Sequence, residues 1–270
     1  MAVQLFTDGL EPDDLDAAVW RFLDQQKFED LLRTSELFFN RADRFEQDDQ
    51  EGLPPEEYLP ILRLNRYDLR DALELNHHIA SLKQFRESFY ICCWHLFREE
   101  TLSMWAKFGP LAVCSTYRRL KAALDSVDPA DEPHLGLVRY GATHLTGWNT
   151  MRFITTKRDR FQEEREVRAL LWIRDEYAGI NRHFDENNFP HDRPLTPPPA
   201  DRVRDFHRRV VDLRALVTEI VLGPWTSADT RASVERTLAE SGYAVSVRAS
   251  ALARNVDLLP TAQEIQRLLK

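Results

Sequence analysis

Short apolar runs alternate with helical patterns along this 270-residue chain, and this alternation constrains its fold more than any other feature. Apolar runs of strand length, bounded by polar or turn-forming residues, are typical of short buried strands. The expected strands are 19–23, 37–39, 89–96, 111–115, 135–140, 167–173, 220–222 and 243–247. Because helical patterns lie between several of them, the sequence predicts an α+β fold of mixed α/β character, with a short-stranded split sheet and surrounding helices.

The expected helices have recognisable ends. A helix over 100–108 should end at Gly109, because the following Pro110 cannot continue a helix. Thr116 can cap the next helix, and residues 261–264 match a capping box. The expected helices are 25–33, 66–86, 100–108, 116–124 and 228–240, with a short helix near the C-terminus. The helix over 228–240 should form a β-α-β unit with the strands on either side of it.

The chain is expected to contain one main domain. We predict an N-terminal arm over 1–18, a single α/β domain over 19–250, and a C-terminal tail with a short helix over 251–270. A Pro-rich stretch marks an exposed insertion at about 176–201, because proline is excluded from helix interiors and central strands.

Hydrophobic residues make up 43% of the chain, which is enough for a substantial core. No apolar run approaches the roughly 18 to 20 residues that are needed to cross a bilayer. The N-terminus lacks the basic start and apolar stretch of a signal peptide. We therefore expect a cytoplasmic protein with no membrane partner.

The cysteine pattern argues against a metal-binding protein, and the charge pattern argues against a protein that binds DNA nonspecifically. The adjacent Cys92 and Cys93 lie among apolar residues and lack zinc-ligand spacing, so we expect inert thiols and no metal. The net charge is −8, and residues 11–51 hold thirteen Asp and Glu against five Lys and Arg. An acidic protein gains little from phosphate neutralisation, which argues against nonspecific DNA binding.

The segment 157–168 carries the densest group of chemically useful side chains. If it is extended, Glu164, Glu166 and Arg168 share one face, and the opposite face beginning at Val167 is apolar. If it is helical, Glu164 and Arg168 form a favourable i,i+4 pair. The segment is therefore either a carboxylate site or an ion-paired surface element.

Several motifs occur in the order typical of a large, functionally uncharacterised bacterial domain family. They are Trp20-Arg21-Phe22, Asn40 with Asp43-Arg44-Phe45-Glu46, Cys93-Trp94-His95, Ser103-Met104-Trp105-Ala106, and Lys157 and Phe161 with Glu164, Glu166 and Arg168. Over about residues 19–250 the chain resembles that family. Two features depart from it: the Asn-Asp-Pro-Phe-Glu-like loop is interrupted and lacks proline, and Lys107-Phe108-Gly109 replaces a Tyr-containing, Gly-rich turn.

This layout is similar to that of a compact ADP-ribosyltransferase, and the resemblance implies NAD as substrate. Arg21 would hold the NAD pyrophosphate as a bidentate donor. Glu166 would bind the ribose and stabilise the oxocarbenium-like charge that forms as nicotinamide leaves. Glu164 would orient or deprotonate the acceptor.

The same resemblance implies further contacts with the cofactor. Trp105 or Phe108 would stack on the nicotinamide, Arg168 would be another cofactor-binding residue, and Ser35 or Ser103 would support the pyrophosphate-binding arginine. The acceptor would be a macromolecule or a small molecule. The biological setting implied by the resemblance is a bacterial toxin or phage-defence effector.

Two other functions fit the residues. In a noncatalytic binding or sensor module, Glu164, Glu166 and Arg168 would form a salt-bridge ladder with Lys157 and Arg21. The acidic segment would then recognise a basic partner, and Trp105 would pack in the core. In a nuclease, Mg²⁺ would be held by Asp43, Glu46, Asp48 and Asp49.

Overall fold

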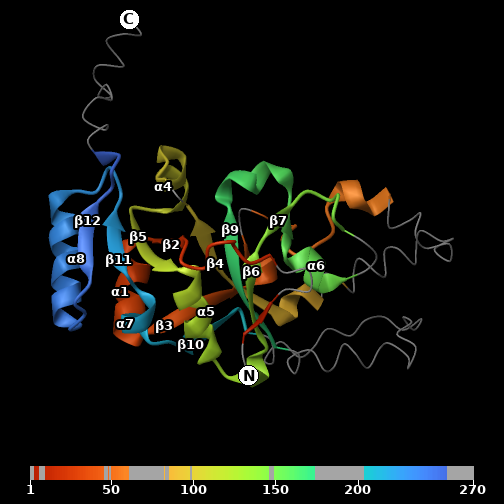
Figure 1. Cartoon of the computed structure of the whole chain (residues 1–270), viewed down its shortest axis with the longest axis horizontal. Coiled ribbons are helices and arrows are strands. Elements are labelled where there is room, and N and C mark those ends of the chain that lie inside the picture. The colour runs from red at the N-terminus through yellow and green to blue at the C-terminus, as the bar shows by residue number, and fades with distance from the viewer. Residues whose placement is uncertain are drawn as a thin grey trace, which may run out of the picture. The chain divides into compact units, whose positions relative to one another are not determined.

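The computed structural model describes residues 3–5, 10–45, 48, 50–60, 82, 85–97, 99–145, 149–173 and 204–253. Most of the helix expected over 66–86, the Pro-rich insertion and the C-terminal helix lie outside these residues. The helices and strands that are described confirm the α+β prediction (Figure 1).

The chain divides into two compact units, each assembled from separate stretches. Unit 1 comprises Met1–Asp13, Leu37–Cys93 and Lys121–Val210, and unit 2 comprises Asp14–Glu36, Trp94–Leu120 and Val211–Lys270. The prediction of one domain over 19–250 remains a prediction.

Unit 1 is built on short strands in the order β1-β6-β9-β4-β3-β10. Their bounds are Gln4–Leu5 (β1), Pro133–Leu137 (β6), Glu166–Trp172 (β9), Phe89–Leu96 (β4), Glu36–Arg41 (β3) and Phe206–Val210 (β10). β3 begins in unit 2, and β4 ends there. β6 pairs parallel with β1 and antiparallel with β9, so the predicted N-terminal arm contributes a strand. β9 therefore has a neighbour on each side.

Two further strands and several short helices complete unit 1. β7 (Arg139–Tyr140) pairs parallel with β8 (Thr156–Lys157), and α6 spans Thr150–Ile154. The 3-10 helices are Ala42–Arg44 (η1), Glu56–Tyr58 (η2), Arg86–Ser88 (η3), Pro129–Asp131 (η4) and Asp159–Glu164 (η5). One core cluster includes Phe89, Ile154 and Leu170, and another includes Tyr58 and Phe153.

In unit 2, β2 (Ala18–Leu23), β5 (Leu111–Thr116), β11 (Glu219–Leu222) and β12 (Ser246–Ala249) follow one another across the sheet. β11 and β12 are parallel, which confirms the predicted β-α-β unit around α8 (Ala228–Glu240). The other helices are α1 (Gln25–Thr34), α4 (Leu102–Phe108) and α7 (Leu213–Leu216). α1 contacts α8 (Figure 1). α5 (Tyr117–Asp125) begins in unit 2 and ends in unit 1.

Local signals explain where the predicted helices of unit 2 begin and end. Asp24 caps α1 by accepting a hydrogen bond from the Lys27 amide, and Thr101 caps α4. Gly109 ends α4 with φ of 136°, and a Cβ at this position would lie 2.9 Å from the Leu23 carbonyl oxygen. Glycine is therefore required there by both conformation and space.

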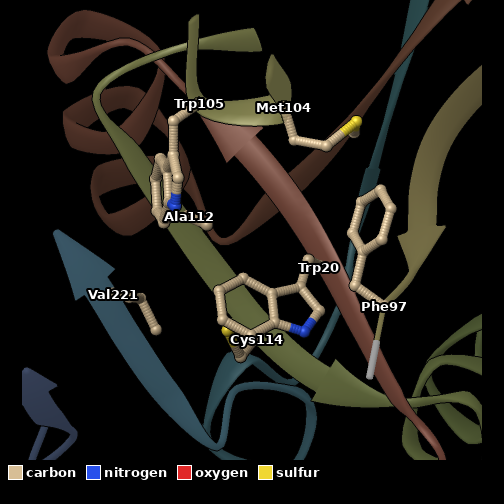
Figure 2. Close-up of a cluster of buried hydrophobic side chains, with 7 residues drawn as sticks. All are labelled: Trp20, Phe97, Met104, Trp105, Ala112, Cys114 and Val221. Carbon is tan, nitrogen blue, oxygen red and sulfur yellow. The ribbon is translucent and has the colours of Figure 1, made fainter. Parts of the chain in front are cut away.

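Aromatic side chains fill the core of unit 2. The cluster brings together residues from β2, β5, β11 and α4 with the residue that follows β4 (Figure 2). Its buried members are Trp20, Phe97, Met104, Trp105, Ala112, Cys114 and Val221. Phe22 packs edge-on against Trp105, with 5.0 Å between ring centroids. The Trp-Arg-Phe and Met-Trp motifs of the sequence therefore meet in one apolar core.

Two strand predictions need correction. The single strand expected over 135–140 is divided into β6 and β7, and Val138 between them donates a backbone hydrogen bond to the Glu166 carbonyl. The strand expected over 243–247 is Ser246–Ala249, because the Tyr243 amide bonds to Leu238 at the end of α8 instead. Within the described residues, no helix has the length and apolar character needed to cross a membrane.

Candidate functional site

Five charged side chains of unit 1 meet in a group that we call the Lys157 cluster: Glu51, Lys157, Glu164, Glu166 and Arg168. Glu51 lies in the turn before η2, Lys157 ends β8, Glu164 ends η5, and the other two lie on β9. Ion pairs therefore connect four elements of unit 1: the turn at Glu51, β8, η5 and β9.

The backbone between Lys157 and Glu166 is neither of the two predicted alternatives. It forms the 3-10 helix η5, which ends at Arg165 in the left-handed conformation with φ 42° and ψ 51°. β9 begins at the next residue. Glu166 and Arg168 share a strand face as predicted, but the prediction was wrong in placing Glu164 on the same strand.

Lys157 holds the two glutamates of the motif together. Its Nζ lies 2.8 Å from Glu164 Oε2 and 2.7 Å from Glu166 Oε2. The side chain of Lys157 is 10% exposed and that of Glu166 is 0% exposed. The part of the predicted salt-bridge ladder that joins Lys157 to the Glu-x-Glu-x-Arg motif is therefore present, although it is buried, and the predicted participation of Arg21 remains a prediction.

Arg168 links the motif to a third carboxylate. Its Nε donates to Glu166 Oε1 at 2.7 Å, and its Nη1 donates to Glu51 Oε1 at 2.8 Å. Nη1 also donates to the Ile154 carbonyl. The Arg168 side chain is 0% exposed and that of Glu51 is 1% exposed. The guanidinium therefore lies between two buried carboxylates.

The surroundings shift the pKa values of Glu166 and Glu51 in opposite directions. Burial raises the pKa of Glu166, but Arg168 and Lys157 outweigh burial and hold that pKa well below its usual value. For Glu51, burial and the nearby Glu166 charge outweigh the same two cations, so the pKa of its carboxyl is raised. Glu51 therefore accepts a proton more readily than an ordinary glutamate.

Lys157 and Arg168 remain charged. Burial lowers the pKa of both groups, but Glu166 and Glu51 outweigh burial and raise it above the ordinary values. Neither cation is a proton donor near neutral pH, and their role here is electrostatic.

Neighbouring groups fix the position of the cluster. The Tyr140 hydroxyl accepts a hydrogen bond from the Glu166 amide at 2.8 Å, and Arg86 Nη1 donates to the Glu51 carbonyl at 3.0 Å. Cys93 lies beside Glu166, and burial followed by that charge raises the pKa of its thiol well above the usual value. This shift supports the expectation of an inert thiol at Cys93.

A small pocket of about 20 Å³ opens beside the Lys157 cluster within unit 1. Glu51 and Lys157 line it together with Arg158, whose guanidinium pairs with Asp48. The remaining lining residues are Gln50, Leu53, Pro54, Pro55, Glu56 and Thr156. The pocket therefore lies beside the buried Glu51 and has room only for a small group.

The predicted NAD-binding residues from the first half of the chain belong to unit 2. Arg21 is half-buried on β2, opposite Val113 of β5. Trp105 is 3% exposed in the core cluster, and its Nε1 donates to Glu100 Oε2 at 3.2 Å. Phe108 is half-buried, with its ring centroid 4.6 Å from that of His95. The expected convergence of Arg21 with Glu166 of unit 1 remains a prediction.

The two supporting serines have local partners in unit 2. The Ser35 hydroxyl hydrogen-bonds to the Tyr243 hydroxyl at 2.8 Å, and that of Ser103 lies 3.1 Å from Thr101 Oγ1. The predicted support of Arg21 by one of these serines remains a prediction.

The acidic segment over 11–51 forms many local ion pairs. The pairs are Glu11–Lys121, Asp16–Arg118, Asp24–Lys27, Asp30–Arg33, Asp43–Arg41, Asp48–Arg158 and Glu51–Arg168. Much of the negative charge that suggested a surface for a basic partner is therefore already paired.

The nuclease interpretation relied on carboxylates of the same segment. Asp43 and Asp48 are engaged by Arg41 and Arg158, while Glu46 and Asp49 lie outside the described residues. The described part of the chain contains no group of three or more His, Cys, Asp or Glu side chains that could hold a metal ion.

Sequence reasoning missed the role of Glu51. It was counted within the acidic segment, yet it binds Arg168 from a position 117 residues away. Its one local signal is the following Gly52, which has φ of 74° and marks a tight turn. A turn of this kind is common and does not reveal a partner so distant in sequence.

No protein-family model, curated protein or solved structure matches this chain. The family resemblance and the transferase assignment remain predictions from the motifs.

Proposed function

We propose that this chain is a noncatalytic binding or sensor module, in which the Lys157 cluster supports a pocket for a small polar ligand. The observation that carries this proposal is the complete burial of Glu166, whose oxygens lie 2.7 Å from Arg168 Nε and 2.7 Å from Lys157 Nζ. A carboxylate held in this way acts as part of the framework.

The geometry of Glu166 is poorly suited to the role that the transferase resemblance assigns to it. A carboxylate that binds ribose hydroxyls must contact the substrate, and a general base needs a pKa near the working pH. Glu166 is 0% exposed, and its pKa is lowered by Arg168 and Lys157. Removing one member of such a buried group leaves its partners uncompensated, which is a structural effect.

NAD-dependent ADP-ribosyl transfer is the second candidate function, and Glu51 is the residue that favours it. Glu51 lines the pocket, and its buried Oε2 has no hydrogen-bond partner among the described residues. Such an oxygen can accept hydrogen bonds from ribose hydroxyls. In this version Glu51, rather than Glu166, contacts the substrate.

Nicotinamide release and thermal unfolding separate the two functions. Purified wild-type protein, Glu166→Gln and Glu163→Gln are each incubated with NAD, and NAD binding is followed by calorimetry. Glu163 is the matched control because it lies on the same 3-10 helix and is exposed. A binding module predicts no NAD binding or cleavage, and a lowered melting temperature in Glu166→Gln alone. Nicotinamide release by the wild type would overturn the proposal, whether or not a stably folded Glu166→Gln variant retains it.

A further inference from the structure

Glu51 enters the Lys157 cluster from a tight turn over residues 50–53, which we call the Glu51 turn. Within the turn, the Leu53 amide donates to the Gln50 carbonyl at 3.0 Å. A Cβ at Gly52 would collide with the Ile154 side chain of α6, so the turn is closely packed. Because the Glu51 side chain is 1% exposed, its carboxyl reaches water only when this turn moves.

Glu51 has weaker contacts with cations than Glu166, although both carboxyls are buried. Oε1 of Glu51 accepts from Arg168 at 2.8 Å, whereas its Oε2 lies 3.8 Å from Lys157 Nζ, beyond hydrogen-bond distance. Glu166 lies 2.7 Å from each of the same two cations, and Lys157 is also shared with Glu164 at 2.8 Å. A buried carboxylate has lost its hydration and needs charged donors in return. Of the two carboxyls, Glu51 is therefore the less able to stay ionised.

The charged groups around Glu51 come from three elements. Arg168 and Glu166 face it from β9, and Lys157 faces it from β8. Arg86 of η3 adds positive charge, and its Nη1 donates to the main-chain carbonyl of Glu51 at 3.0 Å. Burial, reinforced by the negative charge of Glu166, outweighs the attraction of Arg168 and Lys157 and raises the pKa of Glu51.

Further titratable side chains lie near these groups. Cys93 and Tyr140, beside Glu166, have pKa values that burial raises, so the thiol and the phenol stay protonated near neutral pH. His144 hydrogen-bonds to Thr156 of β8 at 2.9 Å, and histidine side chains ordinarily change charge between about pH 5 and 8. A test of Glu51 must therefore be separated from titration of His144.

The pocket beside the Lys157 cluster has two walls. One wall consists of the Glu51 turn and its flanking residues, and the other consists of β8 and the residue after it; the lining residues are Asp48, Gln50, Glu51, Leu53, Pro54, Pro55 and Glu56 on the first wall and Thr156, Lys157 and Arg158 on the second. The ion pair of Asp48 with Arg158 joins the two walls. A movement of the turn away from β8 therefore widens the pocket.

We propose that Glu51 makes the Glu51 turn, and with it the pocket, responsive to pH. The turn stays packed against β8 and β9 while Glu51 is protonated. When the carboxyl loses its proton to solvent, the turn moves outward to hydrate the charge, and the pocket widens. The inference rests on the proposed binding or sensor function and adds the regulation of its pocket.

The sign of the effect on stability follows from the raised pKa. In the unfolded chain Glu51 ionises near the ordinary value of about 4.3, whereas in the folded protein it keeps its proton to a higher pH. The stability contributed by protonated Glu51 is thus fully present below about pH 4.3 and is lost as pH rises through the folded value. Over that interval the equilibrium constant for unfolding should rise by up to about tenfold for each pH unit.

Nuclear magnetic resonance of the wild-type protein tests the proposal directly. The side-chain carboxyl ¹³C resonance of Glu51 should titrate with a midpoint above the ordinary value of about 4.3. Over the same pH interval the Leu53 amide should exchange with solvent faster, after correction for the intrinsic pH dependence of exchange, because its hydrogen bond to Gln50 opens. A midpoint at or below the ordinary value, or constant protection of Leu53 through the titration, would overturn the proposal.

Urea unfolding of variants locates the effect. Glu51→Gln keeps the shape of the protonated carboxyl without its titration, so it should match the wild type near pH 4 and be the more stable protein at higher pH, on the order of tenfold in the unfolding constant one unit above the ordinary value. The same divergence should persist when both proteins also carry Glu56→Gln, an exposed position on the pocket, or His144→Gln.

Two outcomes of the urea series would contradict the proposal. A Glu51→Gln variant less stable than the wild type at every pH would show that ionised Glu51 is the required partner of Arg168. Loss of the divergence in the His144→Gln background would assign the response to the histidine. Failure of the pH response would leave the noncatalytic function standing, because nicotinamide release decides that question separately.

Discussion

Two ion clusters in this chain use the same chemical groups in different surroundings. In the Lys157 cluster of unit 1, Arg168 and Glu166 are both 0% exposed. In unit 2, Arg248 binds Glu100 and Glu219 at 2.8 Å each, and the side chains of Arg248, Glu219 and Glu100 are 39%, 31% and 8% exposed. We call this second group the Arg248 cluster. The pair distances are similar, so distance alone does not distinguish the roles of the two clusters.

The comparison indicates that the effect of an ion pair on stability depends on how deeply it is buried. Water reaches Arg248 and Glu219 and screens the charges of that pair, so the pair adds little stability and can be lost at small cost. In the Lys157 cluster the charged groups are removed from water, so every carboxylate depends on its cations to offset the cost of desolvation. A buried cluster is therefore fragile toward single substitutions, even where its net contribution to stability is modest.

The largest effect is expected for Arg168→Met. This change leaves Glu51 and Glu166 buried without their shared guanidinium, and breaking such a group costs about 3–5 kcal/mol. Urea denaturation should show a large fall in the free energy of unfolding, or loss of the folded state. A change smaller than about 1 kcal/mol would show that the cluster is hydrated and comparable to a surface pair.

The pH dependence of stability should reveal the ionised state of Glu166 in the Lys157 cluster. The pKa of Glu166 is lowered on folding, so its contribution is present above the unfolded value of about 4.3 and is lost as pH falls through the lower folded value. Urea unfolding of wild type and Glu166→Gln should therefore converge as pH is lowered below about 4. A constant difference down to pH 2, on the order of two units below that value, would contradict an ionised Glu166.

A smaller effect is expected for Arg248→Met in unit 2. Its two ion pairs are partly exposed, and the Arg248 side chain also lies over Trp20 at 5.5 Å. We expect a loss of about 1 kcal/mol that decreases at high salt. Thermal unfolding at low and high sodium chloride measures it. A loss equal to that of Arg168→Met would remove the distinction between the clusters.

The smallest effect is expected for Arg231→Met on α8. Its i,i+4 pair with Glu235 is 2.9 Å long, and both side chains are about half exposed, at 47% and 49%. Removal should change stability by less than about 0.5 kcal/mol. The variant serves as the surface reference for both clusters, measured in the same urea series.

Local elements of both units were largely predictable. β4 has the predicted bounds, and α1, α4, α5 and α8 lie where caps and periodicity placed them. Hydrophobic pattern and capping depend on neighbouring residues, so one sequence contains the information. The short strands β1, β8 and β10 were missed because two to five residues give little periodic signal.

The sequence by itself determined the α+β class, most of the described helices and strands, and the presence of a charged Glu-x-Glu-x-Arg motif after Lys157. Tertiary structure decided that this motif is buried, because β9 has a neighbouring strand on each side and its polar face is enclosed. It also brought Glu51 to Arg168 across 117 positions. Contacts between residues so far apart depend on the packing of the whole unit, which no local pattern encodes.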